Sequence, residues 1–169
     1  MITLLRHLLA MATLPFTVAV LVPIWIAQRS GVALTLGHSV GAVLLQVIGL
    51  ALLSLGLTLF VASVRQFATE GKGTLAPWDP PKMFVVRGPY QFVRNPMISA
   101  VIFLLFGEAF GLLSPRHGIW AVCFVILNLI YIPLVEEPQL ERRFGDSYRE
   151  YRRHVRRFIP HHRPWRPIP

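Results

Sequence analysis

The sequence predicts an all-α integral membrane protein, with about four transmembrane helices and a cytoplasmic amphipathic C-terminal helix. Hydrophobic residues make up 54% of the 169 residues and charged residues only 15%, against about 25% in soluble domains. The mean hydropathy is +0.54, yet the formal net charge is +9, so the charge must be confined to particular segments. This hydrophobicity excludes disorder for most of the chain. The single cysteine excludes an internal disulfide and a cysteine-based zinc site.

The first predicted span covers about residues 8–27 and carries no charge. Its length matches the roughly 20 apolar residues that cross a bilayer as a helix. Pro15 and Pro23 interrupt it, which membrane helices tolerate. A signal peptide is the alternative, but the run is long for one and no clear cleavage site follows it. We interpret it as a retained helix.

The second predicted span covers about residues 40–64. A stripe rich in small residues recurs along it at steps of four and three: Ala42, Gln46, Gly49, Leu53, Gly56, Phe60 and Ser63. Small residues allow membrane helices to approach closely. The stripe therefore predicts helix packing, either within one chain or between chains.

The third and fourth predicted spans, about residues 97–113 and 118–135, form a hairpin. Glu137 precedes Pro138, and the residue before a proline disfavours the helical conformation. We therefore expect the fourth span to end and the chain to bend near Glu137.

The connection of residues 65–96 is long and contains eight glycines and prolines. A connection of this length is rarely a plain linker in a compact chain. The glycine pair at positions 71 and 73 neither follows a strand nor opens an evident helix, so it predicts a turn rather than a nucleotide-binding motif. All 169 residues are expected to form one domain.

Lysine and arginine predict the topology. The connection carries five of them and the tail from Arg142 carries nine, whereas the two other loops carry only Arg29 and Arg116. Positively charged loops stay in the cytoplasm. Both termini and the long connection are therefore predicted to be cytoplasmic, in what we expect is a bacterial inner membrane. A membrane flank explains the basic tail better than nucleic-acid binding does.

The tail, residues 136–160, is predicted to be an amphipathic helix on the membrane surface, in contact with anionic head groups. Ser147 and Glu150 have the spacing of a capping box that restarts the helix after Gly145. One face is apolar and the other is rich in arginine. The apolar face comprises Leu140, Phe144, Tyr148, Tyr151, Val155 and Phe158.

Three groups of polar residues are candidates for function. Pro96 predicts a helix start with Asn95 as its N-cap, although Arg94 and Tyr90 beside a helix N-terminus could also hold an anion. The adjacent Glu136 and Glu137 cannot share a helix face, so one can face a pocket while the other meets solvent or the tail arginines.

Glu108 lies inside the third span, where ionisable residues are costly and commonly functional. Either it forms a structural hydrogen bond, for example with Asn128, or it faces substrate. The six histidines show no metal-ligand spacing, and no metal site is predicted.

Three segments, GKGTLAPWDPPKMFVVRGPY, GPYQFVRNPMISA and EEPQLERRFGDSYREYRRHVRRFIP, together resemble the isoprenylcysteine carboxyl methyltransferase and phospholipid N-methyltransferase superfamily, in its bacterial form, over about residues 70–160. The resemblance implies a membrane-embedded, S-adenosylmethionine-dependent methyltransferase with a cytoplasmic cofactor pocket. Carried over, the pocket comprises Gly88, Tyr90, Arg94, Asn95, Pro96, Glu136 and Glu137. Asn95 and Glu108 are the candidate catalytic residues.

This sequence departs from the family pattern at three positions: Asn95 replaces a common His, Ile98 a common Tyr and Ala100 a common Gly. A role that needs an imidazole at position 95 is therefore in doubt. A glutamate could pair with the cofactor ammonium and an arginine with its carboxylate, and Tyr90 could lie near the sulfonium.

The expected acceptor is a lipid or small hydrophobic molecule; a carboxylate, an amine and a thiol all remain open, as does the oligomeric state. A carboxylate is already ionised and needs no base, whereas an amine must lose a proton, which Glu108 or Glu136 could take. Two other function classes stay open: a membrane scaffold that binds anionic lipids, and a sterol-reductase-like enzyme that uses NADPH.

Overall fold

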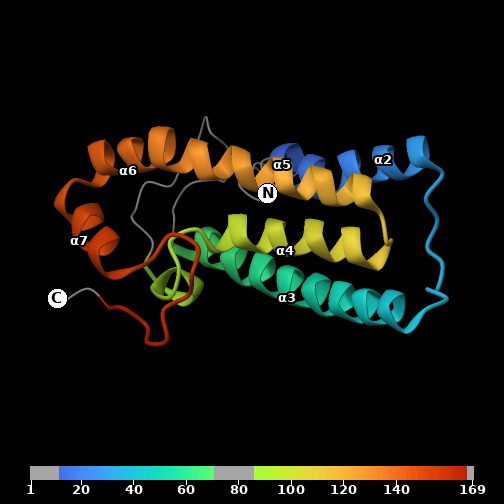
Figure 1. Cartoon of the computed structure of the whole chain (residues 1–169). Helices are drawn as coiled ribbons and strands as arrows, with labels where there is room; N and C mark the ends of the chain where they lie inside the picture. Colours follow the sequence, from blue (N-terminus) through green and yellow to red (C-terminus); the bar gives the residue numbers. More distant parts are fainter. Residues whose placement is uncertain (1–11, 71–85, 167–169) are drawn as a thin grey trace.

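The computed structural model describes residues 12–70 and 86–166, and within these ranges all regular structure is helical (Figure 1). The predicted all-α class is confirmed for this part of the chain. The elements, in order, are the π-helix η1 (Ala12–Leu21), α2 (Val22–Ser30), α3 (Val40–Glu70), the 3₁₀ turn η2 (Gly88–Gln91), α4 (Pro96–Gly111), α5 (Pro115–Tyr131), the π-helical turn η3 (Ile132–Glu136), α6 (Glu137–Phe144) and α7 (Asp146–His154).

Two helical stretches, Val40–Gln66 and Pro115–Phe144, are long and apolar enough to cross a membrane. In the apolar 18-residue stretch of each, only 17% is buried inside the protein. Most of their side chains therefore face outward, as lipid-facing helices require. Leu14–Ser30 and Pro96–Gly111 are apolar but shorter. Each of the four predicted spans thus falls on an apolar helix, apart from residues 8–11, which lie outside the described residues.

Helices α3 and α4 lie side by side (Figure 1), and glycines at their contact allow the two backbones to approach closely. A Cβ atom on Gly49 would lie 2.6 Å from the Gly111 nitrogen, and one on Gly107 would lie 2.9 Å from the Gly49 carbonyl oxygen. Any side chain at these positions would force the two backbones apart. The small-residue stripe therefore packs within the chain, as small residues do in membrane helix pairs.

The N-terminal helix is joined to α5 by two side-chain contacts to its backbone carbonyls. Trp120 Nε1 donates to the Val18 carbonyl at 3.1 Å, and a ring nitrogen of the buried His117 lies 3.1 Å from the Pro23 carbonyl. In a π-helix the carbonyl of residue i pairs with the N–H of residue i+5. For Val18 that residue is Pro23, which has no N–H, so the indole supplies the missing donor.

The expectation that the fourth span ends near Glu137 is wrong. Glu137 is helical, with φ −61° and ψ −43°, and α5, η3 and α6 follow one another without a break from Pro115 to Phe144. Pro138 would clash with the carbonyl four residues earlier in a regular α-helix. The preceding turn is instead π-helical, with the Glu137 N–H bonded to the Ile132 carbonyl, and such a bulge accommodates the ring without ending the helix.

The predicted break at Gly145 is confirmed, because this glycine adopts a φ of +54° between α6 and α7. The predicted helix extent to residue 160 is wrong, since Val155 is extended and the chain is irregular from there to Arg166. No side-chain cap starts α7, which begins at Asp146, so the predicted capping box does not form.

Most of the apolar face of the tail packs against the protein itself. Tyr148, Tyr151 and Val155 are at most 2% exposed and form a cluster with Val86. Leu140, Phe144 and Trp165 pack against this cluster. The tail therefore folds back onto the segment that leads into α4.

Candidate functional site

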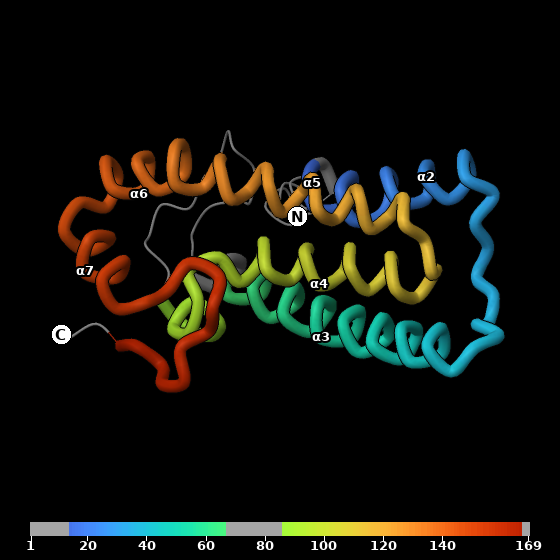
Figure 2. The backbone as a smooth tube through the Cα atoms, viewed as in Figure 1, coloured from blue at the N-terminus to red at the C-terminus, as the bar shows by residue number. Residues whose placement is uncertain are grey.

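The last described residues run alongside the segment that enters α4 (Figure 2). We call residues 155–166 the C-terminal strap and residues 87–95 the entry segment. Four backbone hydrogen bonds join them: Arg94 N to Arg156 O at 2.8 Å, Asn95 N to Arg157 O at 3.3 Å, His161 N to Phe92 O at 2.8 Å, and Trp165 N to Gln91 O at 3.0 Å. The beginning of α4 is thus fixed by residues about 60 positions later in the chain.

The entry segment is also held by α7 and by α3. The buried hydroxyl of Tyr151 donates to the Tyr90 carbonyl at 2.7 Å. Gly88 has a φ of +58°, and a Cβ atom there would lie 3.1 Å from Gln66 Oε1 of α3. Only glycine adopts this conformation readily in so little space, which explains the residue type at position 88.

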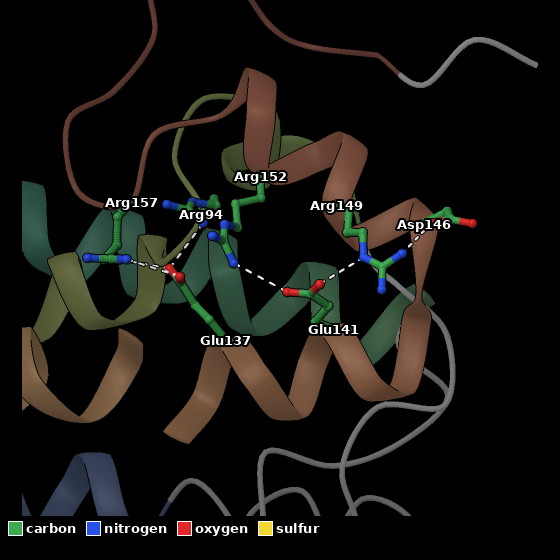
Figure 3. Close-up of polar contacts among 7 residues, drawn as sticks. All are labelled: Arg94, Glu137, Glu141, Asp146, Arg149, Arg152 and Arg157. Atoms are coloured by element: carbon green, nitrogen blue, oxygen red, sulfur yellow. Dashed lines mark hydrogen bonds and ion pairs between the residues drawn. The ribbon is translucent and has the colours of Figure 1, made fainter. Parts of the chain in front are cut away.

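Glu137 lies at the centre of a buried ion cluster (Figure 3). Its side chain is 5% exposed. Arg157 donates to it twice, from Nε at 2.7 Å and from Nη2 at 3.0 Å, and Arg94 Nη1 lies 3.0 Å from Oε1. A buried carboxylate needs such partners, and this one has two cations, which leaves the cluster with a net positive charge.

Arg94 is buried, and not all of its hydrogen-bond donors have an acceptor among the described residues. Its Nε and Nη1 atoms have no hydrogen-bond acceptor among the described residues, although Nη1 is within ion-pair distance of Glu137. Arg94 is also hydrogen-bonded to Tyr148; burial and the negative charge of Glu137 nevertheless raise the pKa of Tyr148 to about 12, against the lowering effect of Arg94. The Nε–H group of Arg94 is therefore a buried donor without an acceptor in the described structure, which is energetically costly.

Glu136 points to different surroundings from Glu137, as adjacent residues on a helix must. It is partly buried, and within the described chain no hydrogen bond or ion pair holds its carboxylate. Burial raises the pKa of Tyr90 well above its ordinary value, and the nearby Tyr151 and the charge of Glu136 raise it further. The expectation that the two glutamates divide, with one meeting a tail arginine, is confirmed for Glu137 and Arg157.

Asn95 precedes the first turn of α4, but its side chain does not cap the helix. Its Nδ2 donates instead to the Arg157 carbonyl at 3.5 Å, and its own carbonyl accepts bonds from the backbone N–H and the hydroxyl of Ser99. The predicted side-chain cap is therefore wrong, and the side-chain amide contacts the strap instead. Pro96 starts the helix as predicted, and it is buried.

Glu108 lies apart from this cluster. It is thirteen residues along α4 from Asn95, which is about 20 Å at 1.5 Å per residue. Its buried Oε2 has no hydrogen-bond partner among the described residues. The predicted bond to Asn128 does not form, since Asn128 Nδ2 donates to the Phe124 carbonyl within its own helix. The structure thus brings together every nominated residue except Glu108.

A second ion cluster lies one helical turn further along α6, around Glu141 (Figure 3). Arg149 Nε donates to Glu141 at 2.8 Å, and Arg152 Nη1 lies 3.3 Å from its other oxygen. Arg149 also contacts Asp146 at 2.8 Å. All four side chains are substantially exposed, so this cluster joins α6 to α7 at the surface.

Three residues of the site, Arg157, Tyr148 and Tyr151, are not among those that the sequence predicts. The tyrosines were placed on the apolar face of the tail, which shows their burial but not what they contact. Arg157 is one of nine tail arginines. It shares with Arg156 a position between Val155 and Phe158, so no local signal distinguishes it. The described residues contain no group of three or more metal-ligand side chains.

A family model described as phospholipid methyltransferase matches residues 44–147, which is more than half of the chain. The match covers nearly all of α3, the entry segment, α4, α5 and both glutamates, and it stops before the strap. Comparisons with curated proteins and with solved structures give no match.

Proposed function

Because the chain belongs to the phospholipid methyltransferase family, we propose that it transfers a methyl group from S-adenosylmethionine to a lipid or small hydrophobic acceptor. The family makes it a membrane methyltransferase that acts on lipid-type acceptors. The cofactor, the acceptor chemistry and the residues that bind them are our proposal. The observation that carries it is the buried charge cluster at the start of α4, where the Nε of Arg94 and the carboxylate of Glu136 find no partner among the described residues.

The residues at this end of the bundle fit the cofactor chemically. S-adenosylmethionine carries a carboxylate, an ammonium and a sulfonium, and it supplies an electrophilic methyl group. The Nε–H group of Arg94, which has no acceptor among the described residues, suits the carboxylate. The carboxylate of Glu136 suits the ammonium, and the ring of Tyr90 is an aromatic neighbour suited to a cation. Gly88 and Pro96 determine the backbone conformation next to these side chains.

Glu137 contributes to the same site through Arg94. Its two oxygens are already occupied by Arg157 and Arg94, so its part is to fix the guanidinium that binds the cofactor. Asn95, at the entrance to α4, is the candidate for contact with the reacting groups. A general base must come within hydrogen-bond reach of its proton, and Glu108 lies about 20 Å along α4 from Asn95, so we do not assign it this role at the cluster.

We further propose that all four apolar helices cross the membrane, with both termini, the site and the tail in the cytoplasm of a bacterial cell. A soluble cofactor would then enter from water and the acceptor from the bilayer. Transfer from a sulfonium is an in-line displacement that depends on positioning and on exclusion of water. The exposed arginines of α6, α7 and the strap would contact anionic head groups.

The experiment is ligand binding by the purified protein in detergent. Addition of S-adenosylmethionine should raise the thermal unfolding temperature, because a ligand that binds only the folded state stabilises it. Glu136→Gln and Arg94→Gln should each abolish that shift, while Glu141→Gln, a matched change in the exposed cluster, should retain it. Stabilisation by NADPH instead would indicate a reductase, and stabilisation by neither would favour a lipid-binding scaffold.

Radiolabelled methyl transfer into extracted bacterial lipids and small hydrophobic molecules then identifies the acceptor, with mass spectrometry of the product. A labelled lipid product supports the proposal. Binding of S-adenosylmethionine without transfer to any lipid or hydrophobic fraction would overturn the acceptor class.

A further inference from the structure

We propose that Arg157 is a positioning residue, which fixes Glu137 and the start of α4 relative to each other and so keeps Arg94 available for a ligand. The inference rests on the proposed function, since the ligand in question is S-adenosylmethionine. It assigns a role to the strap, which lies outside the range that the family model matches.

The side chain of Arg157 sets the orientation of Glu137. Its Nε and Nη2 atoms donate to the two different oxygens of that carboxylate, at 2.7 and 3.0 Å. A two-point contact between a planar guanidinium and a carboxylate fixes direction as well as distance. The hydrogen bond to Glu137 also raises the pKa of Arg157, consistent with a permanently charged partner for a buried carboxylate.

The main chain of Arg157 holds the other half of the site. Its carbonyl accepts from the backbone nitrogen of Asn95 at 3.3 Å and from the side-chain amide of Asn95 at 3.5 Å. The same residue therefore binds α6, 20 positions earlier, and the start of α4, 62 positions earlier. If α6 rotated relative to the start of α4, Arg157 would lose its contacts either with Glu137 or with Asn95.

The charge balance explains why a second arginine is needed. If Arg94 were the only cation near Glu137, burial would favour full pairing between the two, and the Arg94 N–H groups would turn to the carboxylate. With Arg157 already bonded to both oxygens, Arg94 reaches the carboxylate only through Nη1, at 3.0 Å, and its Nε keeps no acceptor in the described structure. Arg157 thus leaves one net positive charge for an anionic group of the ligand.

Arg156 provides a matched control. Its side chain is exposed, and its contact with the entry segment is made by its carbonyl, which a side-chain substitution leaves in place. Arg156→Gln and Arg157→Gln remove the same charge from neighbouring positions of the strap. Arg157→Lys keeps the charge but cannot reproduce the two-point contact.

The test measures the dissociation constant for S-adenosylmethionine by calorimetry and hydrogen exchange of the peptide that contains residues 91–99. Arg157→Gln should weaken binding roughly ten- to a hundredfold, as loss of a residue that orients a binding side chain commonly does, and should speed exchange in that peptide. Arg157→Lys should fall between Arg157→Gln and the wild type. Arg156→Gln should match the wild type in both measurements.

Unchanged affinity and exchange in Arg157→Gln, or equal losses in Arg156→Gln, would overturn the positioning role. If Arg157→Gln does not fold, Arg157→Lys decides alone, because wild-type affinity in that variant excludes a need for the two-point contact. If the wild type binds no S-adenosylmethionine, the proposed function fails. The exchange measurement still shows in that case whether Arg157 fixes the start of α4.

Discussion

Glu137 and Glu141 lie one turn apart on α6, and each contacts two arginines, yet their surroundings differ (Figure 3). The side chain of Glu137 is 5% exposed and that of Glu141 is 31% exposed. Glu137 joins three segments that are distant in sequence, namely α6, the entry segment and the strap. Glu141 joins only α6 to the helix that follows it.

The difference shows that the number of ion pairs does not indicate what a cluster does. Exposed pairs contribute little, because water already solvates both partners and salt screens them. A buried carboxylate that loses its partners remains desolvated without compensation. The Glu137 cluster should therefore govern both folding of this end of the protein and ligand binding, while the Glu141 cluster should tolerate change.

The largest effect is expected from Glu137→Ala. Removal of this carboxylate leaves Arg94 and Arg157 facing each other without a counterion, and breaking a buried pair costs about 3–5 kcal/mol. Denaturant unfolding in detergent, followed by tryptophan fluorescence, measures the loss. A loss below about 1 kcal/mol, the scale of an exposed pair, would remove the distinction between the two clusters.

A double-mutant cycle compares the coupling energy of the buried ion pair with that of the exposed one. Glu137→Gln and Arg157→Gln, alone and together, should show a coupling energy of about 1–3 kcal/mol, because the residues share two hydrogen bonds. The equivalent cycle on Glu141 and Arg152 should show no measurable coupling at physiological salt. Additive effects of the first pair would mean that the buried contact is not formed in solution.

Alkaline pH probes the buried cluster through Tyr148. Burial and the charge of Glu137 raise the pKa of Tyr148 to about 12 in the folded protein, from 10.0. Its stabilising contribution is therefore complete below pH 10 and is lost as the pH rises from 10 to 12, since the unfolded chain releases the proton first. In Tyr148→Phe the decline of the unfolding temperature over this range should be shallower. An identical decline would assign it to other groups.

The smallest effect is expected from Arg149→Gln in the exposed cluster. The unfolding temperature should stay within experimental error of the wild type at physiological salt and fall slightly at low salt, where screening is weaker. Thermal unfolding at two ionic strengths checks this. A large loss that is independent of salt would show that the exposed cluster also has a structural role.

The sequence predicted the apolar helices and the residue types of the site because these depend on local patterns. Apolar runs identify helices that lie in a membrane, Pro96 identifies a helix start, and Gly145 a helix end. The failures came where tertiary contacts override local rules. Pro138 did not end the helix, because the π-helical turn before it absorbs the ring.

Long-range contacts were not predictable for a similar reason. The apolar face of the tail indicated burial against something, and a membrane surface and a protein surface require the same pattern. Similarly, no local feature separates Arg157 from the neighbouring arginines, since its importance comes from a carboxylate 20 residues away and an amide 62 residues away. Glu108 was nominated for its cost in a membrane, which says nothing about its distance from the other residues.

The position of the strap in the chain also bears on how the protein is made. All four apolar helices precede residue 155, so the ribosome synthesises them before the residues that bond to the entry segment. Arg94 and Glu137 are therefore synthesised before their partner. The site is completed last, and loss of the strap by an early stop codon would leave a bundle able to insert but lacking the residue that joins α6 to α4.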